Sequence, residues 1–180
     1  MKKTIVLLAC VLVLAIAATA AHAQENINFA DLPLVASPTP MPTSYAGLNW
    51  TNFFYVDPSQ YTSGGAGYKN PLTNRDVVFI GGQFCAPASP GCFGIITAPT
   101  PWQQFEAVSA TMAAGYQPNQ VHILAYKSGK LVGSMTVLLG TSAHTINFPQ
   151  SWGVITELQI ETNGVGNLVL LDLSVFTLGG

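Results

Sequence analysis

The feature that most constrains this chain is the recurrence of short strand-forming runs between turn residues, with almost no helical periodicity. In one such run, Val154, Thr156, Leu158 and Ile160 share one face, whereas Ile155, Glu157, Gln159 and Glu161 share the other. Ten runs of this kind follow one another: Ile27–Phe29, Leu48–Val56, Asp76–Ile80, Gly94–Ala98, Phe105–Met112, Val121–Tyr126, Leu131–Leu139, Thr145–Phe148, Val154–Glu161 and Val169–Val175. The spacing predicts an all-β fold, a single jelly-roll-like β-sandwich of about 8–10 antiparallel strands.

Three segments carry finer predictions. The residues Lys127-Ser128-Gly129-Lys130 separate two strand-forming runs and predict a tight β-hairpin, with Gly where a positive φ is needed. Residues 103–115 hold enough Ala and Met to permit a helix, but Val108 and Thr111 favour a strand. In the last run, Val169, Leu171, Leu173 and Val175 are expected on one face, and Asp172 and Ser174 on the other.

The N-terminus has the form of an export signal. Lys2 and Lys3 precede an apolar run at 5–17, and Ala21-His22-Ala23 matches the A-x-A pattern of signal peptidase sites. The apolar run is shorter than the roughly 20 residues of a transmembrane helix. The alternative is a lipoprotein, because Leu7-Leu8-Ala9-Cys10 resembles a lipobox. We expect cleavage near Ala23 and a secreted or periplasmic/extracellular mature protein.

The remaining residues, 24–180, are expected to form one β-sandwich domain without a transmembrane segment. A Pro-rich segment at 33–42 is either a flexible tail or a loop that follows a first strand. We find no internal repeat that would indicate a second unit.

Charge is scarce in this chain. Only 8% of residues are charged, and beyond the signal four basic residues stand against eight acidic ones, for a formal net charge of −4. Binding to a nucleic-acid backbone needs clustered cations, so nucleic acid is not expected as a partner. Thr, Ser, Asn, Gln and Gly supply the polarity instead, as suits the outer strand faces of extracellular β-proteins.

Cys85 and Cys92 are the two cysteines beyond the signal. They enclose Pro and Gly residues that favour turns, and an exported protein meets an oxidising compartment. This pattern predicts a disulfide that closes a small loop. A zinc site is the weaker alternative, because two thiolates supply only half of its ligands.

Several stretches resemble those of secreted jelly-roll β-sandwich proteins, many of which carry PEP-CTERM sorting tails in bacteria. The resemblance rests on Asn28–Leu32, Tyr45–Asp57, Lys127–Gly133 and Leu170–Val175. The fold of these proteins is similar to that of carbohydrate-binding modules, and most of them have no established activity. This chain ends Phe176-Thr-Leu-Gly-Gly180 without the Pro-Glu-Pro tail, so membrane sorting by that route is not expected.

Aromatic side chains are the strongest candidates for a binding site. Sugars present apolar C–H faces that stack on flat rings, beside amides and hydroxyls that bind their hydroxyl groups. We expect Trp50, Phe54 and Trp152 in the core. The loop residues Tyr61, Tyr68 and Trp102 are the predicted ligand-binding residues, with a glycan or cell-surface polysaccharide as the partner.

The resemblance also implies a structural calcium ion. Related carbohydrate-binding modules often hold one between segments near the two chain ends, where this chain has Asp31 and Asp172. The alternative is that each aspartate accepts backbone hydrogen bonds in a turn. No other cofactor is expected.

No catalytic residues are predicted, because the sequence contains no zinc-protease helix motif and no nucleophile elbow. Glu157 and Glu161 share a strand face about 13 Å apart, too far for glycoside hydrolysis, which needs about 5 to 9.5 Å. We therefore expect a non-catalytic secreted protein of the cell surface or matrix with glycan affinity. The alternatives are an extracellular polysaccharide hydrolase and a purely structural, self-associating protein.

Overall fold

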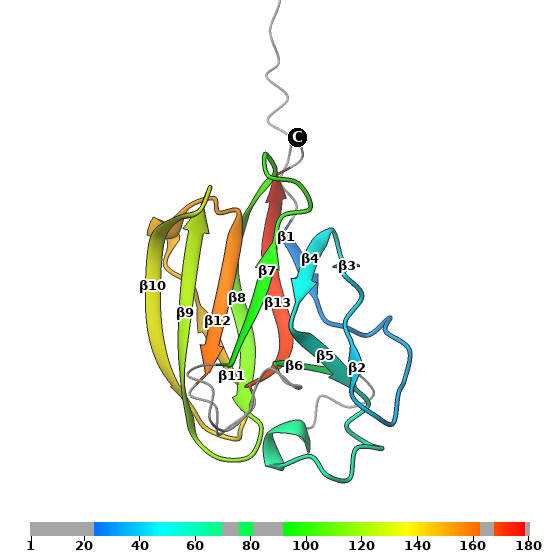
Figure 1. The fold of residues 1–180 in the computed structure, drawn as a ribbon. Coiled ribbons are helices and arrows are strands. Elements are labelled where there is room, and N and C mark those ends of the chain that lie inside the picture. The colour runs from blue at the N-terminus through cyan, green and yellow to red at the C-terminus, as the bar shows by residue number, and fades with distance from the viewer. Residues whose placement is uncertain (1–23, 70–75, 81–91, 163–167, 179–180) are drawn as a thin grey trace, which may run out of the picture.

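The computed structural model describes residues 24–69, 76–80, 92–162 and 168–178, and these residues form strands joined by loops and two short 3-10 helices (Figure 1). The strands are β1 (Gln24–Ile27), β2 (Thr39–Pro40), β3 (Ser44–Tyr45), β4 (Leu48–Thr51), β5 (Phe53–Val56), β6 (Val77–Ile80), β7 (Cys92–Thr97), β8 (Gln104–Ala114), β9 (Asn119–Lys127), β10 (Lys130–Leu139), β11 (His144–Asn147), β12 (Glu157–Thr162) and β13 (Leu168–Leu178). The helices are η1 (Ala66–Lys69) and η2 (Gln150–Trp152). Within these ranges no helix has the length and apolar character needed to span a bilayer.

Two antiparallel sheets make up the fold. The seven-stranded sheet has the order β11-β8-β13-β6-β5-β2, and β1 pairs with β13 beside this path. The six-stranded sheet has the order β10-β9-β12-β7-β4-β3. In Figure 1 strands β8, β11 and β13 lie behind β9, β12 and β7. The predicted all-β sandwich is confirmed.

Nine of the ten predicted runs contain or overlap most of a strand, including residues 103–115, which form β8 rather than a helix. The run Ile27–Phe29 is the exception: β1 lies earlier, at Gln24–Ile27, and Phe29 has a φ of 59° outside the strand. The run Leu48–Val56 divides into β4 and β5 at Asn52, whose φ of 63° breaks the extended backbone. The hairpin at 127–130 is confirmed, with Ser128 at φ 50° and Gly129 at φ 77°. Strands β2 and β3, two residues each, were not predicted, because so short a run shows no alternation.

The main core lies between the sheets. Phe29 packs edge-on against Trp50, and Trp50 packs in the same way against Phe53, with centroid distances of 5.7 and 5.2 Å. Trp50 and Trp152 are buried as predicted. Phe54 differs: it is half-buried and packs on Phe79 in a second cluster that also contains Val56, Tyr68, Val77, Val169 and Leu171.

The predicted faces of the last strand are wrong at one point. Val169 and Leu171 belong to the second cluster, whereas Leu173 and Val175 belong to the main core. The register between β13 and β8 shifts between Leu170 and Asp172, which indicates a β-bulge. A bulge adds one residue to a strand and so exchanges the faces beyond it.

The Pro-rich segment 33–42 is a loop after the first strand, and it includes β2. It is tied to the sandwich by two backbone hydrogen bonds: the Val35 carbonyl accepts from the Asp57 amide at 2.8 Å, and the Met41 amide donates to the Phe53 carbonyl at 2.9 Å. Of the two alternatives for this segment, the loop is the correct one. The predicted signal peptide at 1–23 lies outside the described residues.

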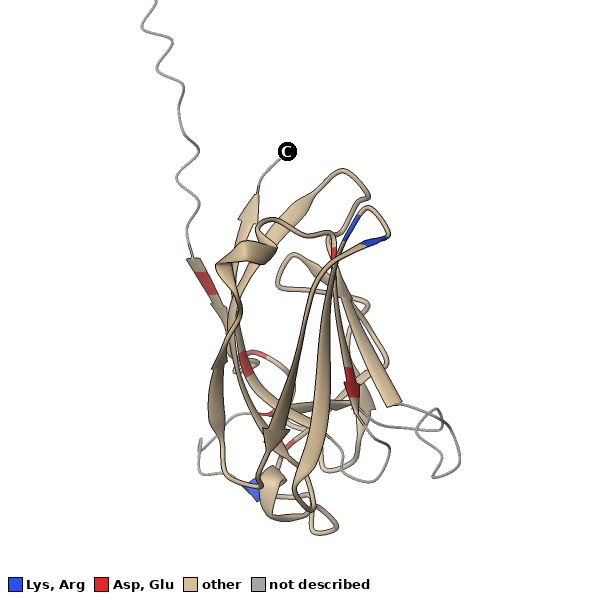
Figure 2. Ribbon diagram, turned by 90° about the vertical axis from the view of Figure 1, so that its left-hand side faces the viewer, with Lys and Arg blue, Asp and Glu red and all other residues tan. Residues whose placement is uncertain are grey.

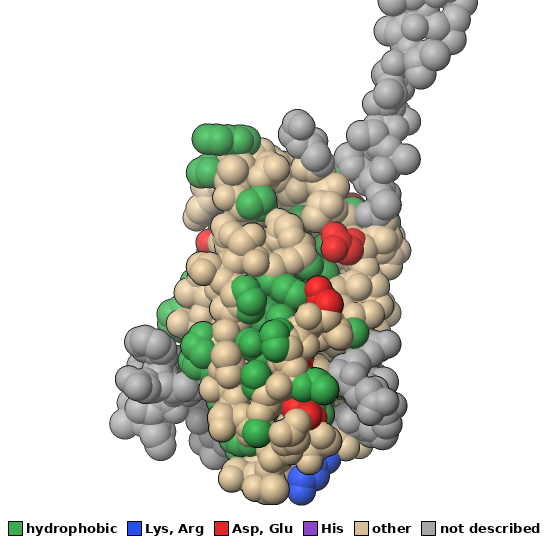
Figure 3. Space-filling model, turned by 90° about the vertical axis from the view of Figure 1, so that its right-hand side faces the viewer, with side chains coloured by type: hydrophobic (Ala, Val, Ile, Leu, Met, Phe, Trp, Pro, Cys, Tyr) green, Lys and Arg blue, Asp and Glu red, His purple; other side chains and the backbone are tan. Residues whose placement is uncertain are grey.

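Charged residues are few in Figures 2 and 3, and the two lysines of the β9–β10 hairpin, Lys127 and Lys130, lie opposite each other. In Figure 3 apolar side chains gather in the middle of the face, with acidic groups along one side. Among the described residues these views show no group of basic residues larger than this pair, in keeping with the low charge of the sequence.

Candidate functional site

The loop 98–103 joins β7 to β8 and lies at the upper end of the sandwich in Figure 1. Two contacts close it into a turn: the Gln103 amide donates to the Thr100 carbonyl at 3.1 Å, and the Thr100 hydroxyl donates to Gln103 Oε1 at 2.9 Å. The Ala98 amide donates to the Thr156 carbonyl at 3.0 Å. Trp102 projects from this anchored loop and is 78% exposed.

An open pocket of about 450 Å³ lies on one side of the loop. It is lined by Asn49, Thr97, Ala98, Pro99, Thr100, Pro101, Ser128, Gly129, Thr156 and Glu157. Asn49, Thr97 and Glu157 are aligned side by side across β4, β7 and β12. Directly opposed residues of neighbouring strands point to the same face of a sheet. These three side chains therefore form the floor, and Tyr126, opposite Glu157 on β9, continues the row.

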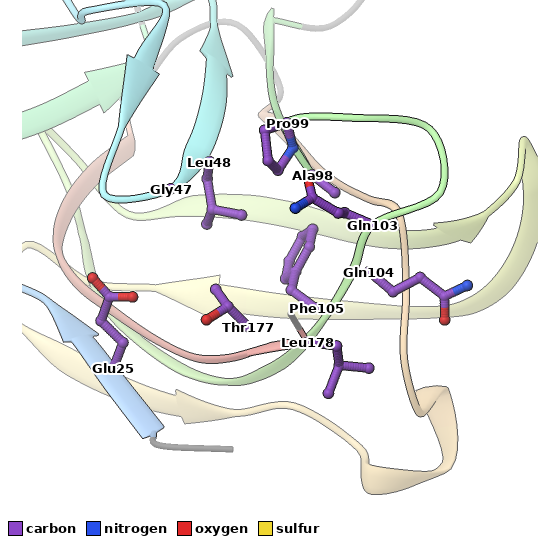
Figure 4. Close-up of a pocket in the computed structure, with 10 residues that line it drawn as sticks. All are labelled: Glu25, Gly47, Leu48, Ala98, Pro99, Gln103, Gln104, Phe105, Thr177 and Leu178. Carbon is purple, nitrogen blue, oxygen red and sulfur yellow. The ribbon is translucent and has the colours of Figure 1, made fainter. Parts of the chain in front are cut away.

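A second pocket, of about 260 Å³, lies on the other side of the same loop and shares Ala98 and Pro99 with the first. Figure 4 shows its lining. Leu48, Phe105 and Leu178 supply apolar surface, and Glu25, Gln103, Gln104 and Thr177 supply polar groups. The loop with Trp102 thus separates two hollows at one end of the sandwich.

The chemistry of the first pocket is that of hydroxyl and amide groups. Thr97, Thr100, Ser128, Thr156 and Asn49 offer both donors and acceptors. Some of this capacity is already used, since Thr156 Oγ1 accepts from the Ser128 amide at 2.9 Å and donates to the Tyr126 carbonyl at 3.3 Å. An exposed indole beside such a lining can stack on an apolar ring face while the pocket binds attached hydroxyl groups.

Trp102 is the one predicted ligand-binding residue that lies at this end. Tyr61 and Tyr68 contact each other at 5.4 Å beside η1, at the lower end in Figure 1. Tyr68 also packs on Tyr116, which follows β8, whereas Trp102 precedes β8. That strand of eleven residues spans about 30 Å. The three aromatic residues therefore share no surface.

Tyr68 is also unavailable as a stacking platform. Its side chain is completely buried, between Phe79 at 5.3 Å and Tyr116 at 5.6 Å. The Gly67 amide donates to the Gly115 carbonyl at 2.9 Å and ties η1 to the end of β8. The binding role predicted for Tyr68 is wrong for this arrangement, and Tyr61 is half-buried against the same cluster.

Asp31 and Asp172 each have a hydrogen-bond partner of their own. The Tyr45 hydroxyl donates to Asp31 Oδ1, and the Thr111 amide donates to Asp172 Oδ1 at 3.2 Å. Burial, and then the bond to Asp31, raise the pKa of Tyr45 well above its usual range. In the described part of the chain, no group of three or more His, Cys, Asp or Glu residues is arranged to hold a metal ion. The calcium ion at Asp31 and Asp172 stays a prediction.

Cys92 is buried at the start of β7, and its carbonyl accepts a hydrogen bond from Thr162 Oγ1 at 3.4 Å. Cys85 lies outside the described residues. The disulfide between them stays a prediction.

Most of the pocket was not predicted. The signal that led to the site was Trp102, placed after Pro101 in a loop. The floor residues Asn49, Thr97 and Glu157 come from three separate strands, and only the sheet register brings them together.

No protein-family model and no curated protein matches the sequence. Among solved structures, a DUF4465 family protein from Bacteroides caccae superposes with a TM-score of 0.53 at 11% identity, over 87% of this chain and 93% of that one. A structure described as "CBM4 structure and function" gives a TM-score of 0.41 at 12% identity, over 84% of this chain and 97% of that one. The Podospora anserina GH26-CBM35 beta-(1,4)-mannanase gives 0.39 at 11% identity, over 88% of this chain and 28% of that one. The chain is similar in fold to the DUF4465 protein. The resemblance to secreted proteins that often carry PEP-CTERM tails stays a prediction.

Proposed function

We propose that this chain is an exported, non-catalytic protein that binds a glycan at the sandwich end carrying Trp102. The observation that carries the proposal is an indole 78% exposed on an anchored loop, next to a pocket lined by hydroxyl and amide groups. The exposed position of Trp102 does not stabilise the fold, because the large apolar surface of the indole stays in water.

A sugar ring would lie on the indole and extend over the wall of Pro99 and Pro101 into the pocket. The ring gains apolar contact, and its hydroxyl groups exchange hydrogen bonds with water for bonds to Asn49, Thr97 or Thr100. A single platform of this kind supports affinities between about 1 mM and 1 μM, or about −4 to −8 kcal/mol. Weak binding of this order suits a component of a cell surface or matrix that carries many copies.

The lining favours binding over hydrolysis. Among the described residues that line the pocket, Glu157 is the only carboxylate. Glycoside hydrolysis generally uses two carboxylates about 5 to 9.5 Å apart. Glu161 lies two positions beyond Gln159 on the same outward face, about 13 Å from Glu157 along the strand, and accepts a bond from Gln159 Nε2 at 2.7 Å.

Binding to insoluble polysaccharides and to a glycan array tests the proposal, with wild type compared with Trp102→Ala. Leu138→Ala is the matched control, because Leu138 is 77% exposed on β10, away from the loop. We expect at least about a tenfold loss of affinity for Trp102→Ala, corresponding to about 1.4 kcal/mol, and no change for Leu138→Ala. Melting temperatures of all three proteins verify that the fold is intact.

Two results contradict the proposal: equal retention of all three proteins, or no binding of wild type to either the insoluble polysaccharides or the glycan array. Release of reducing ends from a bound polysaccharide, abolished by Glu157→Gln, would instead support the hydrolase alternative.

Self-association is the second candidate function, and one observation favours it. β10 is an edge strand of ten residues, and Leu131, Val132 and Leu138 on it are exposed. A long edge strand with apolar side chains is a template for pairing with another chain. Sedimentation of wild type and Leu138→Lys distinguishes this candidate, since a charge on the edge should dissociate an assembly formed there.

A further inference from the structure

Two aspartates, Asp57 and Asp76, lie at one end of the β5–β6 ladder. Val56 pairs with Val77 at the end of the β5–β6 ladder, so the next residues outward, Asp57 and Asp76, lie opposite each other. By strand alternation both side chains share the face of Tyr55 and Val78, which belong to the core between the sheets. Two carboxylates thus point from neighbouring strands into the interior.

Both carboxylate oxygens of Asp57 accept hydrogen bonds. Its Oδ1 accepts from the Ser59 amide at 2.8 Å and from the Ser59 hydroxyl at 2.7 Å, and its Oδ2 accepts from Gln60 Nε2 at 2.6 Å. These bonds satisfy an ionised carboxylate and fix its position. They still leave lone pairs on Oδ2 for a further partner.

Asp76 is in the opposite situation. It is only 2% exposed, and neither carboxyl oxygen has a hydrogen-bond partner among the described residues. Burial of a carboxylate without donors is costly, and a second carboxylate across the ladder adds repulsion. A core position of this kind is normally occupied by an apolar side chain. We therefore expect the Asp76 carboxylate to have a positively charged partner.

We propose that Asp57 and Asp76 together bind a divalent cation, calcium, at the end of the β5–β6 ladder. Oxygen atoms are the ligands that calcium prefers, and it accepts irregular sets of carboxylates, carbonyls and water. Magnesium fits less well, because it demands near-ideal octahedral geometry and releases its water reluctantly. Two carboxylates balance the charge of one such ion, and water and backbone carbonyls complete its coordination.

This site is separate from Asp31 and Asp172, and it does not depend on glycan binding. A site with two carboxylates in an extracellular module is expected to bind calcium with a Kd of about 0.1 to 1 mM. Calcium at about ten times the Kd should raise the melting temperature by about 3 to 6 °C relative to protein in chelator.

The test compares melting temperatures in chelator and in 5 mM calcium for wild type, Asp76→Asn, Asp172→Asn and Asp31→Asn. We expect the calcium response in wild type, Asp172→Asn and Asp31→Asn, and its loss in Asp76→Asn. In chelator Asp76→Asn should melt higher than wild type, because the amide removes the buried charge.

Terbium luminescence of wild type and Asp31→Asn provides a second measurement, in case Asp76→Asn does not fold. Asp31→Asn is included because Tyr45 contacts Asp31 and would also sensitise terbium bound there. The Tyr61 amide donates to the Asp57 carbonyl at 3.1 Å, so a tyrosine lies near enough to sensitise terbium at the site. One equivalent of sensitised terbium that calcium displaces, in both wild type and Asp31→Asn, supports the proposal. Absence of any calcium response in wild type overturns it, as does a response that survives in Asp76→Asn or is lost only in Asp31→Asn or Asp172→Asn.

Discussion

Gly133 lies directly against the indole of Trp152. A Cβ atom at position 133 would stand 2.1 Å from both Cδ1 and Nε1 of that ring. Trp152 is buried and stacks on Phe148 at 5.6 Å with an interplanar angle of 19°. The register of β10 against β9 also shifts between Leu131 and Gly133. The edge strand therefore bends over the indole at the one residue without a side chain.

This contact predicts the effect of a single methyl group. Gly133→Ala should destabilise the fold by about 1 to 3 kcal/mol, because Trp152 or the β10 backbone must move. Gly140→Ala is the matched control on the same side of the sandwich, since a Cβ there meets nothing within 4 Å. Urea denaturation monitored by tryptophan fluorescence measures both. A change of less than about 0.5 kcal/mol for Gly133→Ala would contradict the packing described.

Truncation to Ala should strongly destabilise the fold at Tyr68 and leave its stability almost unchanged at Trp102. Tyr68→Ala leaves a cavity beside Phe79 and Tyr116 and should cost about 3 to 5 kcal/mol of stability. Trp102→Ala removes an exposed ring and should change stability by less than about 0.5 kcal/mol. Thermal melting of the two variants measures this difference. Equal destabilisation by the two changes would place Trp102 in a packed environment and remove the basis for a stacking platform.

The stability of the metal-free protein should depend on pH through Asp76. Burial, and then the charge of Asp57, raise the pKa of Asp76 from 3.8 to about 6. A folded-state pKa above the unfolded value means that stability is fully present below about pH 4 and is lost as pH rises through about 6. The loss amounts to at most about 3 kcal/mol.

Asp57 acts in the opposite sense. The Ser59 hydroxyl, together with the Ser59 amide and Gln60, lowers the pKa of Asp57 against the effect of burial. Its contribution is present above the unfolded value and is lost as pH falls below about 4. Melting temperatures from pH 3 to 8 in chelator should therefore peak near pH 4. Asp76→Asn should remove the decline between pH 4 and 7, and an unchanged decline in that variant would assign it to another group.

The cysteine pair predicts a local cross-link. Cys85 and Cys92 should be joined in protein purified from an oxidising compartment, and the closed loop should contribute about 2 to 3 kcal/mol. Intact mass after alkylation, with and without prior reduction, counts the free thiols. Two alkylated cysteines in the unreduced sample would show that the bond does not form.

The sequence by itself determined the strands of this protein, because alternation and turn residues act between neighbours along the chain. Residues 121–139 form the predicted hairpin, and residues 103–115 form a strand although their composition permits a helix. The same local signals gave a wrong prediction of side-chain faces where pairing with a neighbouring strand introduces a bulge. Leu171 and Leu173 were expected on one face, but the bulge against β8 places them on opposite sides of the sheet.

Only the tertiary structure decided which side chains meet. Trp102 could be selected from its loop, yet its pocket depends on Asn49 and Glu157, which reach one floor because β4 and β12 both pair with β7. Asp57 and Asp76 face each other because β5 and β6 pair in one particular register. Register is set by the packing of both sheets at once, and a one-residue slip would turn every side chain to the other face. Sites built across strands therefore depend on contacts between distant segments, which no single stretch of the sequence specifies.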